Sequence, residues 1–227
     1  MINYSDILAS IIHDVKNSLS VVVNHVDEIM VDEEVSEKVK NSAGIMQQET
    51  RRANNQLIQL LTLYKLDKER LNPNIQEHNV YDFLEELMIE EQSLAKAQNI
   101  EILIECDEWL SGYFDQDLIR GVLSSSIGNA KRYTKDTILL SADIEDDYLI
   151  IRVDDNGVGF PEVFIESANK HTDDESVGND FREGRTQLGF YFAANITRAH
   201  ENRGRCGFMK LKNGNKLSGG CFELWLP

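Results

Sequence analysis

Apolar residues recur at alternating steps of four and three along the first 70 residues of the chain, which contain no proline and one glycine. The first series consists of Leu8, Ile12, Val15, Leu19, Val22, Val26 and Ile29. After the polar stretch at residues 32–34, a second series consists of Val39, Ala43, Met46, Thr50, Ala53, Leu57, Leu60 and Tyr64, in which only the threonine is a poor match. This heptad spacing predicts two long amphipathic helices joined by a short turn.

Two helices connected in this way form an antiparallel hairpin, so residues 1–70 are expected to be one helical domain. A single hairpin buries two apolar stripes poorly. We therefore expect two copies to pair as a dimeric four-helix bundle, which makes the protein a homodimer. The alternative is that the hairpin packs on the second domain of its own chain.

The rest of the chain alternates between helical and strand periods. Residues 71–78 contain Pro73 between two asparagines and are typical of a linker. Helices are predicted over residues 79–98, 115–131 and 188–200, and strands over residues 100–104, 138–144 and 149–153 and on both sides of Asn213-Gly214. Residues 155–187 lie between the predicted strand at 149–153 and the predicted helix at 188–200, and they are expected to form a long loop. The domain at residues 79–227 is thus predicted to be an α+β sandwich, with helices on one face of a mixed sheet.

The composition excludes several classes of function. The formal net charge of −16 argues against nonspecific nucleic-acid binding and against docking on an anionic membrane. No stretch approaches the roughly 20 apolar residues of a membrane helix, and the start of the chain lacks the features of a secretion signal. The odd number of cysteines, Cys106, Cys206 and Cys221, predicts reduced thiols in a cytoplasmic protein.

His13 directly follows Ile12 of the first apolar series, so it is expected on the surface of the bundle. Asn17 lies on the same helical face, and Asp14 is adjacent in sequence. Taken alone, such a histidine is usually a solvated polar residue. The run from His13 to Leu19, however, resembles the phosphoacceptor box of bacterial sensor histidine kinases, in which many members have proline where this chain has Ser18.

The chemistry of that box needs these residue types. Neutral imidazole is a nucleophile near neutral pH, and an adjacent acid can hold its tautomer and take up the developing charge. The resemblance implies that His13 accepts the phosphoryl group with the help of Asp14. Asn17 could orient a water that attacks a partner's acyl phosphate, which would add phosphatase activity.

Asp155, Gly157 and Gly159 follow a predicted strand in the second region. A carboxylate fixed at a strand end can accept a hydrogen bond from an amino group such as that of adenine. Glycines allow backbone to come close to a ring. The plainer interpretation of this run is a simple glycine turn.

Asn129, Arg132 and Tyr133 end a predicted helix. An amide oxygen such as that of Asn129 is a suitable ligand for magnesium, which is otherwise held by phosphates and water. Arg132 could contact phosphate, and Tyr133 could cover the ligand. Free N–H groups that suit an anion are expected at the start of the next helix, at Thr186, Leu188 and Gly189.

The order and spacing of these groups resemble the ATP-binding domain of histidine kinases, the Bergerat-type fold shared with gyrase and Hsp90. The matching motifs are an N box with Asn129 as its magnesium ligand, a G1 box at residues 155–159 and a G2 box at residues 188–189. The resemblance covers about residues 5–227 and implies ATP and Mg²⁺ as cofactors. Its departures are Ser125 in place of an earlier N-box asparagine, and Arg185 and Gln187 in place of G2-box glycines.

A two-component histidine kinase is therefore expected, which phosphorylates itself on His13 and passes the phosphoryl group to an aspartate of a response-regulator receiver domain. Because His13 lies near the start of the sequence, the signal should arrive from a separate sensor protein in trans, unless the sequence is part of a longer chain. One alternative is a non-enzymatic phosphotransfer or adaptor protein with a degenerate nucleotide domain, which the departures at Ser125, Arg185 and Gln187 would fit. Another is a Bergerat-type ATPase or serine kinase without phosphohistidine chemistry.

Overall fold

The computed structural model describes residues 4–31, 35–67, 72–170 and 187–227. The chain divides into two compact units, unit 1 at Met1–Leu71 and unit 2 at Asn72–Pro227. Within the described ranges, none of the helices combines the length and the apolar character needed to cross a bilayer.

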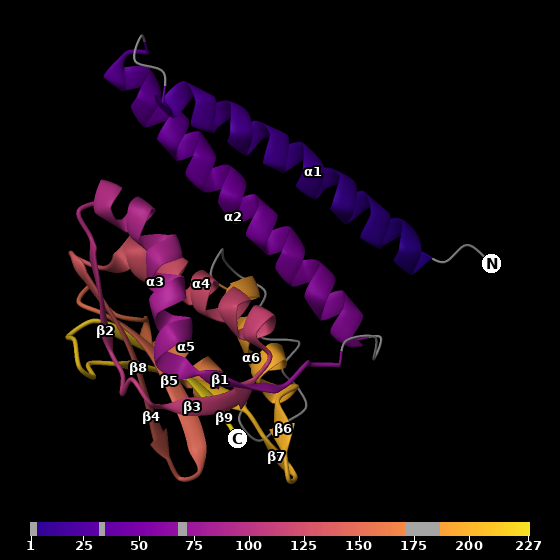
Figure 1. Cartoon of the computed structure of the whole chain (residues 1–227), viewed down its shortest axis with the longest axis vertical. Helices are drawn as coiled ribbons and strands as arrows, with labels where there is room; N and C mark the ends of the chain where they lie inside the picture. Colours follow the sequence, from indigo (N-terminus) through magenta and orange to yellow (C-terminus); the bar gives the residue numbers. More distant parts are fainter. Residues whose placement is uncertain (1–3, 32–34, 68–71, 171–186) are drawn as a thin grey trace. The chain divides into compact units, whose positions relative to one another are not determined.

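Unit 1 contains two long helices, α1 (Tyr4–Val31) and α2 (Glu37–Asp67), which lie side by side (Figure 1). Val26 of α1 and Ala43 of α2 are the buried apolar side chains in the described part of this unit. Six residues of the two apolar series are instead 38–62% exposed, and we call them the exposed seam: Val15, Val22, Ile29, Val39, Met46 and Leu60. The pairing of two copies into a four-helix bundle stays a prediction.

Unit 2 is built on a five-stranded sheet with the order β2-β4-β5-β9-β8. Its strands are β2 (Glu101–Glu105), β4 (Thr137–Glu145), β5 (Tyr148–Asp155), β8 (Phe208–Asn213) and β9 (Gly220–Leu226). β2 and β4 are parallel and the other neighbours are antiparallel, so the prediction of a mixed sheet is confirmed. The helices α3 (Val80–Ala97), α4 (Gln116–Tyr133) and α6 (Gln187–Arg198) pack against this sheet and against one another (Figure 1).

The two faces of the sheet differ in chemistry, because successive side chains of a strand point to opposite sides. One row across the sheet joins Leu140, Val153, Phe222 and Leu211, all buried beneath the helices, and we call this side the inner face. The neighbouring row joins Ser141, Arg152, Glu223 and Lys210, and we call that side the outer face. Apolar burial thus fixes which side of the sheet the helices cover.

The segment at residues 155–187, predicted as a loop, contains the helix α5 (Glu162–Lys170), so the prediction is wrong for those nine residues. Ala168 of this helix is buried, and the Asn169 amide exchanges hydrogen bonds of 3.1 and 3.2 Å with the backbone of Leu211 on β8. These tertiary contacts stabilise a helix that the polar composition of the segment did not predict. The rest of the predicted loop, residues 171–186, lies outside the described residues.

Short strands also lie where no strand was predicted. β1 (Gln76–Asn79) pairs with β3 (Ser111–Phe114), and β6 (Glu201–Asn202) pairs with β7 (Arg205–Cys206). β1 occupies the second half of the stretch interpreted as a linker. Segments of two to four residues carry too little alternation to be recognised.

Candidate functional site

Asp155 ends β5 on the inner face and is 6% exposed. Its Oδ1 accepts a hydrogen bond of 2.7 Å from the backbone N–H of Gly157, and the backbone N–H of Gly220 also donates to this carboxylate. Burial raises the pKa of Asp155, and these two hydrogen bonds lower it without fully compensating. A carboxylate that has lost much of its hydration gains strongly from a further hydrogen-bond donor.

Glycines surround this carboxylate because no side chain would fit beside it. A Cβ added to Gly219 would lie 2.3 Å from Asp155 Oδ1, and one added to Gly220 would lie 3.0 Å from Oδ2. A Cβ on Gly157 would lie 2.9 Å from Oδ1 and within 2 Å of the carbonyl oxygen of Tyr133. The backbone therefore approaches Asp155 at three glycines, of which only Gly157 belongs to the motif found in the sequence.

Gly159 and Phe160 are fixed against β8. The φ of Gly159 is +77°, a conformation that favours glycine, and its missing side chain leaves room for the amide of Asn213. That amide accepts from Phe160 N at 2.7 Å and donates to Phe160 O at 2.8 Å. The Phe160 ring consequently lies against Gly220, next to Asp155, as part of an apolar wall with Phe190.

Asn156 has a role that sequence reasoning missed. Its Oδ1 accepts hydrogen bonds of 2.8–3.2 Å from Thr134 Oγ1 and from the backbone N–H groups of residues 135–137. Its Nδ2 donates to Asp136 at 2.7 Å. One amide therefore ties the end of β5 to the turn that follows α4. An asparagine directly after Asp155 was the available signal, but its partners lie about 20 residues away in the chain.

α4 carries the predicted N-box residues. Its first turn is capped by Asp115, whose Oδ1 accepts from Leu118 N at 3.0 Å. Asn129 is half-buried near the other end, whereas Arg132 and Tyr133 are exposed. The contact between Gly157 and the Tyr133 backbone brings the end of α4 to Asp155.

α6 carries Leu188 and Gly189, both half-buried in its first turn. A Cβ on Gly189 would lie 2.9 Å from Ser125 Oγ, so α4 and α6 approach each other closely at this pair. Ser125, one of the departures from the resembled family, thus faces the G2-box glycine. Thr186 and Arg185 lie outside the described residues, and so does the side chain of Gln187.

His13, Asp14 and Asn17 lie on α1 in unit 1, as the helical pattern predicted. Asn17 is exposed, and the side chains of His13 and Asp14 lie outside the described part of the chain. These three residues are not among those gathered around Asp155, which all belong to unit 2.

Asn129 is the residue predicted to hold a magnesium ion that is also bound by phosphates. No group of three or more His, Cys, Asp or Glu residues among the described residues could hold a metal ion. Magnesium in phosphate sites usually keeps several waters and takes one or two protein oxygens besides the substrate's own. A single amide oxygen at Asn129 meets that modest requirement.

Comparisons with known proteins agree with this geometry. The sequence resembles the sensor protein SrrB of Staphylococcus aureus, with 25% identity over 200 residues, which are 86% of this chain and 34% of SrrB. The chain thus spans about a third of the length of the curated relatives it matches. The fold resembles histidine kinase AdeS of Acinetobacter baumannii (TM-score 0.59, 16% identity, 92% of this chain and 95% of that one). It also resembles full-length ShkA in complex with AMPPNP (TM-score 0.61, 18% identity, 97% of this chain and 44% of that one).

These likenesses confirm the resemblance to the catalytic core of sensor histidine kinases. Residues 114–227 match the family described as histidine kinase-, DNA gyrase B- and HSP90-like ATPase. The matched region begins at the end of β3 and contains Asn129, Asp155 and Gly189. On the strength of that match over half of its length, the chain belongs to this family of ATPases.

Proposed function

We propose that the protein is a two-component histidine kinase that uses ATP to phosphorylate His13 and then passes the phosphoryl group to an aspartate of a response regulator. The observation that carries the proposal is the buried Asp155 carboxylate, held by backbone N–H groups and enclosed by glycines, in a chain that belongs to an ATPase family. The box around His13 supplies the acceptor.

Asp155 is proposed to bind the amino group of adenine. Two backbone donors satisfy part of the carboxylate and fix its orientation, and the remaining lone pairs can accept from a ligand N–H. The Phe160 ring and the glycines beside it offer a flat, apolar surface to a planar base. The complex of ShkA with AMPPNP, an adenine nucleotide, is consistent with this assignment.

The phosphates are proposed to extend from Asp155 toward the ends of α4 and α6. Asn129 would hold Mg²⁺, which when bound neutralises phosphate charge. Arg132 and Tyr133 at the end of α4 are exposed and can reach a ligand beside Gly157. The first turn of α6, with Leu188 and Gly189, is proposed to bind an anion through its backbone N–H groups, together with the predicted motif residue Thr186.

In the proposed reaction an imidazole nitrogen of His13 attacks the γ-phosphorus. A nitrogen–phosphorus bond forms while the bond from the γ-phosphorus to the bridging oxygen breaks, and ADP leaves. Asp14 takes the imidazole proton or stabilises the charge that develops. The phosphoryl group then moves to the receiver-domain aspartate, and Asn17 orients the water of a phosphatase reaction.

The exposed seam of unit 1 supports the proposed homodimer. Six apolar side chains in heptad positions are 38–62% exposed in the single chain. A second copy would cover them in a four-helix bundle.

The free cysteines Cys106, Cys206 and Cys221 fit a reducing compartment such as the cytoplasm.

Incubation with γ-labelled ATP and Mg²⁺ tests the proposal. The wild type should take up label that is lost in acid and survives base. His13→Ala should take up none but still bind nucleotide, and Asp155→Asn should lose at least about tenfold in nucleotide affinity, because a charged hydrogen bond is removed. Undiminished labelling of His13→Ala would refute the assignment.

The second candidate is a phosphotransfer or adaptor protein whose nucleotide domain is degenerate. Ser125, which replaces an asparagine of the resembled family, lies directly against Gly189 at the junction of α4 and α6. A nucleotide titration separates the two candidates, because the adaptor should show no ATP-dependent rise in melting temperature.

A further inference from the structure

Asp154 and Asp155 are adjacent in β5 and therefore point to opposite faces of the sheet. Asp155 lies on the inner face in the proposed nucleotide site. Asp154 lies on the outer face, in register with Cys221 of β9, and its exposed fraction is 0%. A fully buried carboxylate needs hydrogen-bond partners, and the partners of Asp154 show which segment it fixes in place.

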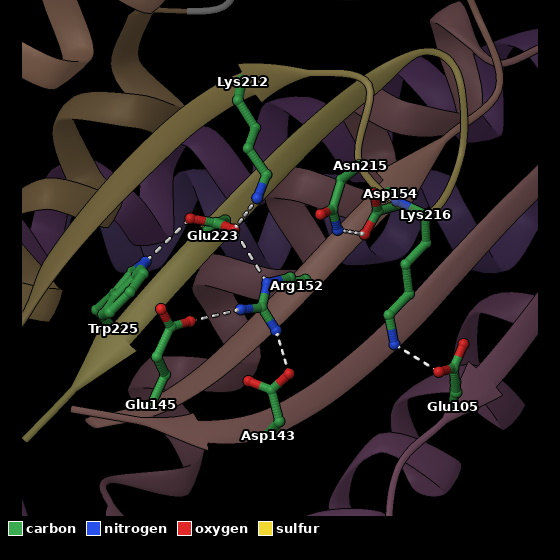
Figure 2. Close-up of polar contacts among 10 residues, drawn as sticks. All are labelled: Glu105, Asp143, Glu145, Arg152, Asp154, Lys212, Asn215, Lys216, Glu223 and Trp225. Atoms are coloured by element: carbon green, nitrogen blue, oxygen red, sulfur yellow. Dashed lines mark hydrogen bonds and ion pairs between the residues drawn. The ribbon is translucent and has the colours of Figure 1, made fainter. Parts of the chain in front are cut away.

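Besides the Cys221 thiol on β9, the partners of Asp154 come from the loop between β8 and β9, residues 214–219 (Figure 2). Its Oδ2 accepts from Asn215 Nδ2, and its Oδ1 accepts from the backbone N–H of Lys216, both at 3.2 Å. The loop is closed by a hydrogen bond of 2.9 Å from Gly214 N to Gly219 O. Asp154 thus fixes the tip of this loop from the outer face.

Lys216 attaches the same loop to a distant strand. Its Nζ lies 2.6 Å from Glu105 Oε1 at the end of β2, and Figure 2 shows this side chain extended along the outer face. β2 is the edge strand farthest from β8 in the sheet order. The loop is therefore held at two points, by Asp154 beneath it and by Glu105 across the sheet.

The far end of this loop contacts Asp155. Gly219 N donates to the backbone carbonyl of Asp155 at 2.8 Å, and Gly220 N donates to its carboxylate. Gly219 and Gly220 pack closely against the carboxylate. A Cβ added to Gly219 would lie 2.3 Å from Oδ1, and one added to Gly220 would lie 3.0 Å from Oδ2. A shift of the loop would consequently turn or expose the carboxylate.

We infer that Asp154, Asn215, Lys216 and Glu105 are positioning residues for nucleotide recognition, which set the orientation of the Asp155 carboxylate from the opposite face of the sheet. This inference rests on the proposed role of Asp155 in binding the adenine amino group. None of the four residues needs to touch the nucleotide. Their effect should appear as selectivity between bases, because only a base with an amino group uses the carboxylate as a partner.

ADP and IDP provide the test, because the inosine base carries a carbonyl oxygen where adenine carries the amino group. Their dissociation constants would be measured by calorimetry on the full chain, for the wild type and for Asn215→Ala combined with Lys216→Met. The double variant should bind ADP about threefold to tenfold more weakly, the value of one or two hydrogen bonds, with IDP affinity unchanged.

Lys212→Met is the matched control. Lys212 Nζ pairs with Glu223 Oε1 at 2.6 Å on the same outer face, and this ion pair is separate from the bonds that Asp154 and Glu105 make with the loop (Figure 2). This control loses the same charge and should keep the selectivity of the wild type. Exchanging the ion pair by Glu105→Lys with Lys216→Glu should restore most of the selectivity lost in Lys216→Met alone.

The outcomes separate the inference from the proposed function. A wild type that binds ADP and IDP equally would refute the role of Asp155 itself. If the wild type prefers ADP and the double variant keeps that preference, the positioning inference is overturned. An equal loss of affinity for both nucleotides would also overturn it, because the loop would then only support the fold.

Discussion

Leu123 of α4 in unit 2 is 0% exposed, whereas Leu60 of α2 in unit 1 is 45% exposed, although both belong to regular apolar series. The same contrast holds for the two units as a whole. Helices cover the inner face of the sheet in unit 2, while the exposed seam of unit 1 has no cover within its own pair of helices. The core of unit 2 is closed, whereas the two helices of unit 1 leave an apolar seam exposed.

This difference shows what periodicity can and cannot establish. A heptad pattern says that a helix has an apolar face, but the partner of that face can belong to the same chain or to a second copy. Buried fractions decide which residues are already covered. Three pairs of matched substitutions, each with one residue in unit 1 and one in unit 2, test this difference.

The largest effect is expected from truncating the two leucines. Leu123→Ala should lower the free energy of unfolding of unit 2 by about 3–4 kcal/mol, because it leaves a cavity in a closed core. Leu60→Ala should cost about 1 kcal/mol or less in the single chain, since the side chain is half in water already. Chemical denaturation at low protein concentration measures both.

The concentration dependence of Leu60→Ala supplies the control. If a second copy covers the exposed seam, this variant should also weaken self-association measured by light scattering, and Leu123→Ala should not. A cost at Leu60 equal to that at Leu123, with no effect on association, would mean that unit 1 closes its core by itself.

Some of this architecture could be read from the sequence, and some could not. Alternation found the strands around residues 138–144 and 149–153, because it reports which face a side chain occupies. It does not report the neighbouring strand, so the parallel pairing of Ile102 with Ile138 was not predictable. α5 was missed because its support comes from β8, some 40 residues later in the chain.

The candidate site follows the same rule. Asp155, Gly157 and Gly159 form a local motif and were found. Gly220 was not, because its role is set by a hydrogen bond to a carboxylate that lies 65 positions earlier in the chain. Short sequence motifs identify the residues at the centre of a site. The distant residues that contact and orient them can be identified only from the three-dimensional structure.

The second pair of substitutions compares ion pairs. Arg152 contacts Glu223 at 3.0 Å and Asp143 at 2.8 Å on the outer face, with 8% of its side chain exposed (Figure 2). Arg152→Met should cost about 2 kcal/mol, because the buried Glu223 loses a charged partner. Arg52 contacts Glu49 at 3.4 Å in unit 1, where the glutamate is 61% exposed. Arg52→Met should cost only about 0.3–0.5 kcal/mol.

A cycle that adds Glu223→Gln checks the cause of the larger loss. The double variant should be less destabilised than the sum of the single variants, since neither partner is then left charged and alone. Raising the salt concentration should reduce the small effect at Arg52 and leave the effect at Arg152 nearly unchanged. Equal salt dependence at both sites would place Arg152 in solvent and weaken the distinction between the units.

The smallest effect is expected from the third pair, the histidines His200 and His25. His200 is 1% exposed; its Nε2 accepts from Asp115 N at 3.0 Å, and its Nδ1 donates to Ile196 O at 2.8 Å. Burial lowers the pKa of His200, and the bond to Ile196 and the charge of Asp115 only partly oppose this. Because the unfolded chain takes up a proton here more readily than the folded one, unit 2 should lose stability as the pH falls below about 6.5.

His200→Gln isolates this effect, since a glutamine oxygen can replace Nε2 as the acceptor but does not titrate. At pH 7.5 the variant should be about 1 kcal/mol less stable, the value of the lost bond to Ile196, and this difference should shrink at lower pH as the wild type weakens. His25 contacts Glu28 at 3.1 Å with 70% of its side chain exposed, so His25→Gln should change stability by only a few tenths of a kcal/mol. A difference at His200 that stays constant with pH would show that the ring takes up its proton as readily in the folded state as in the unfolded one, and the buried interior of unit 2 would then tolerate charge as readily as the surface of unit 1.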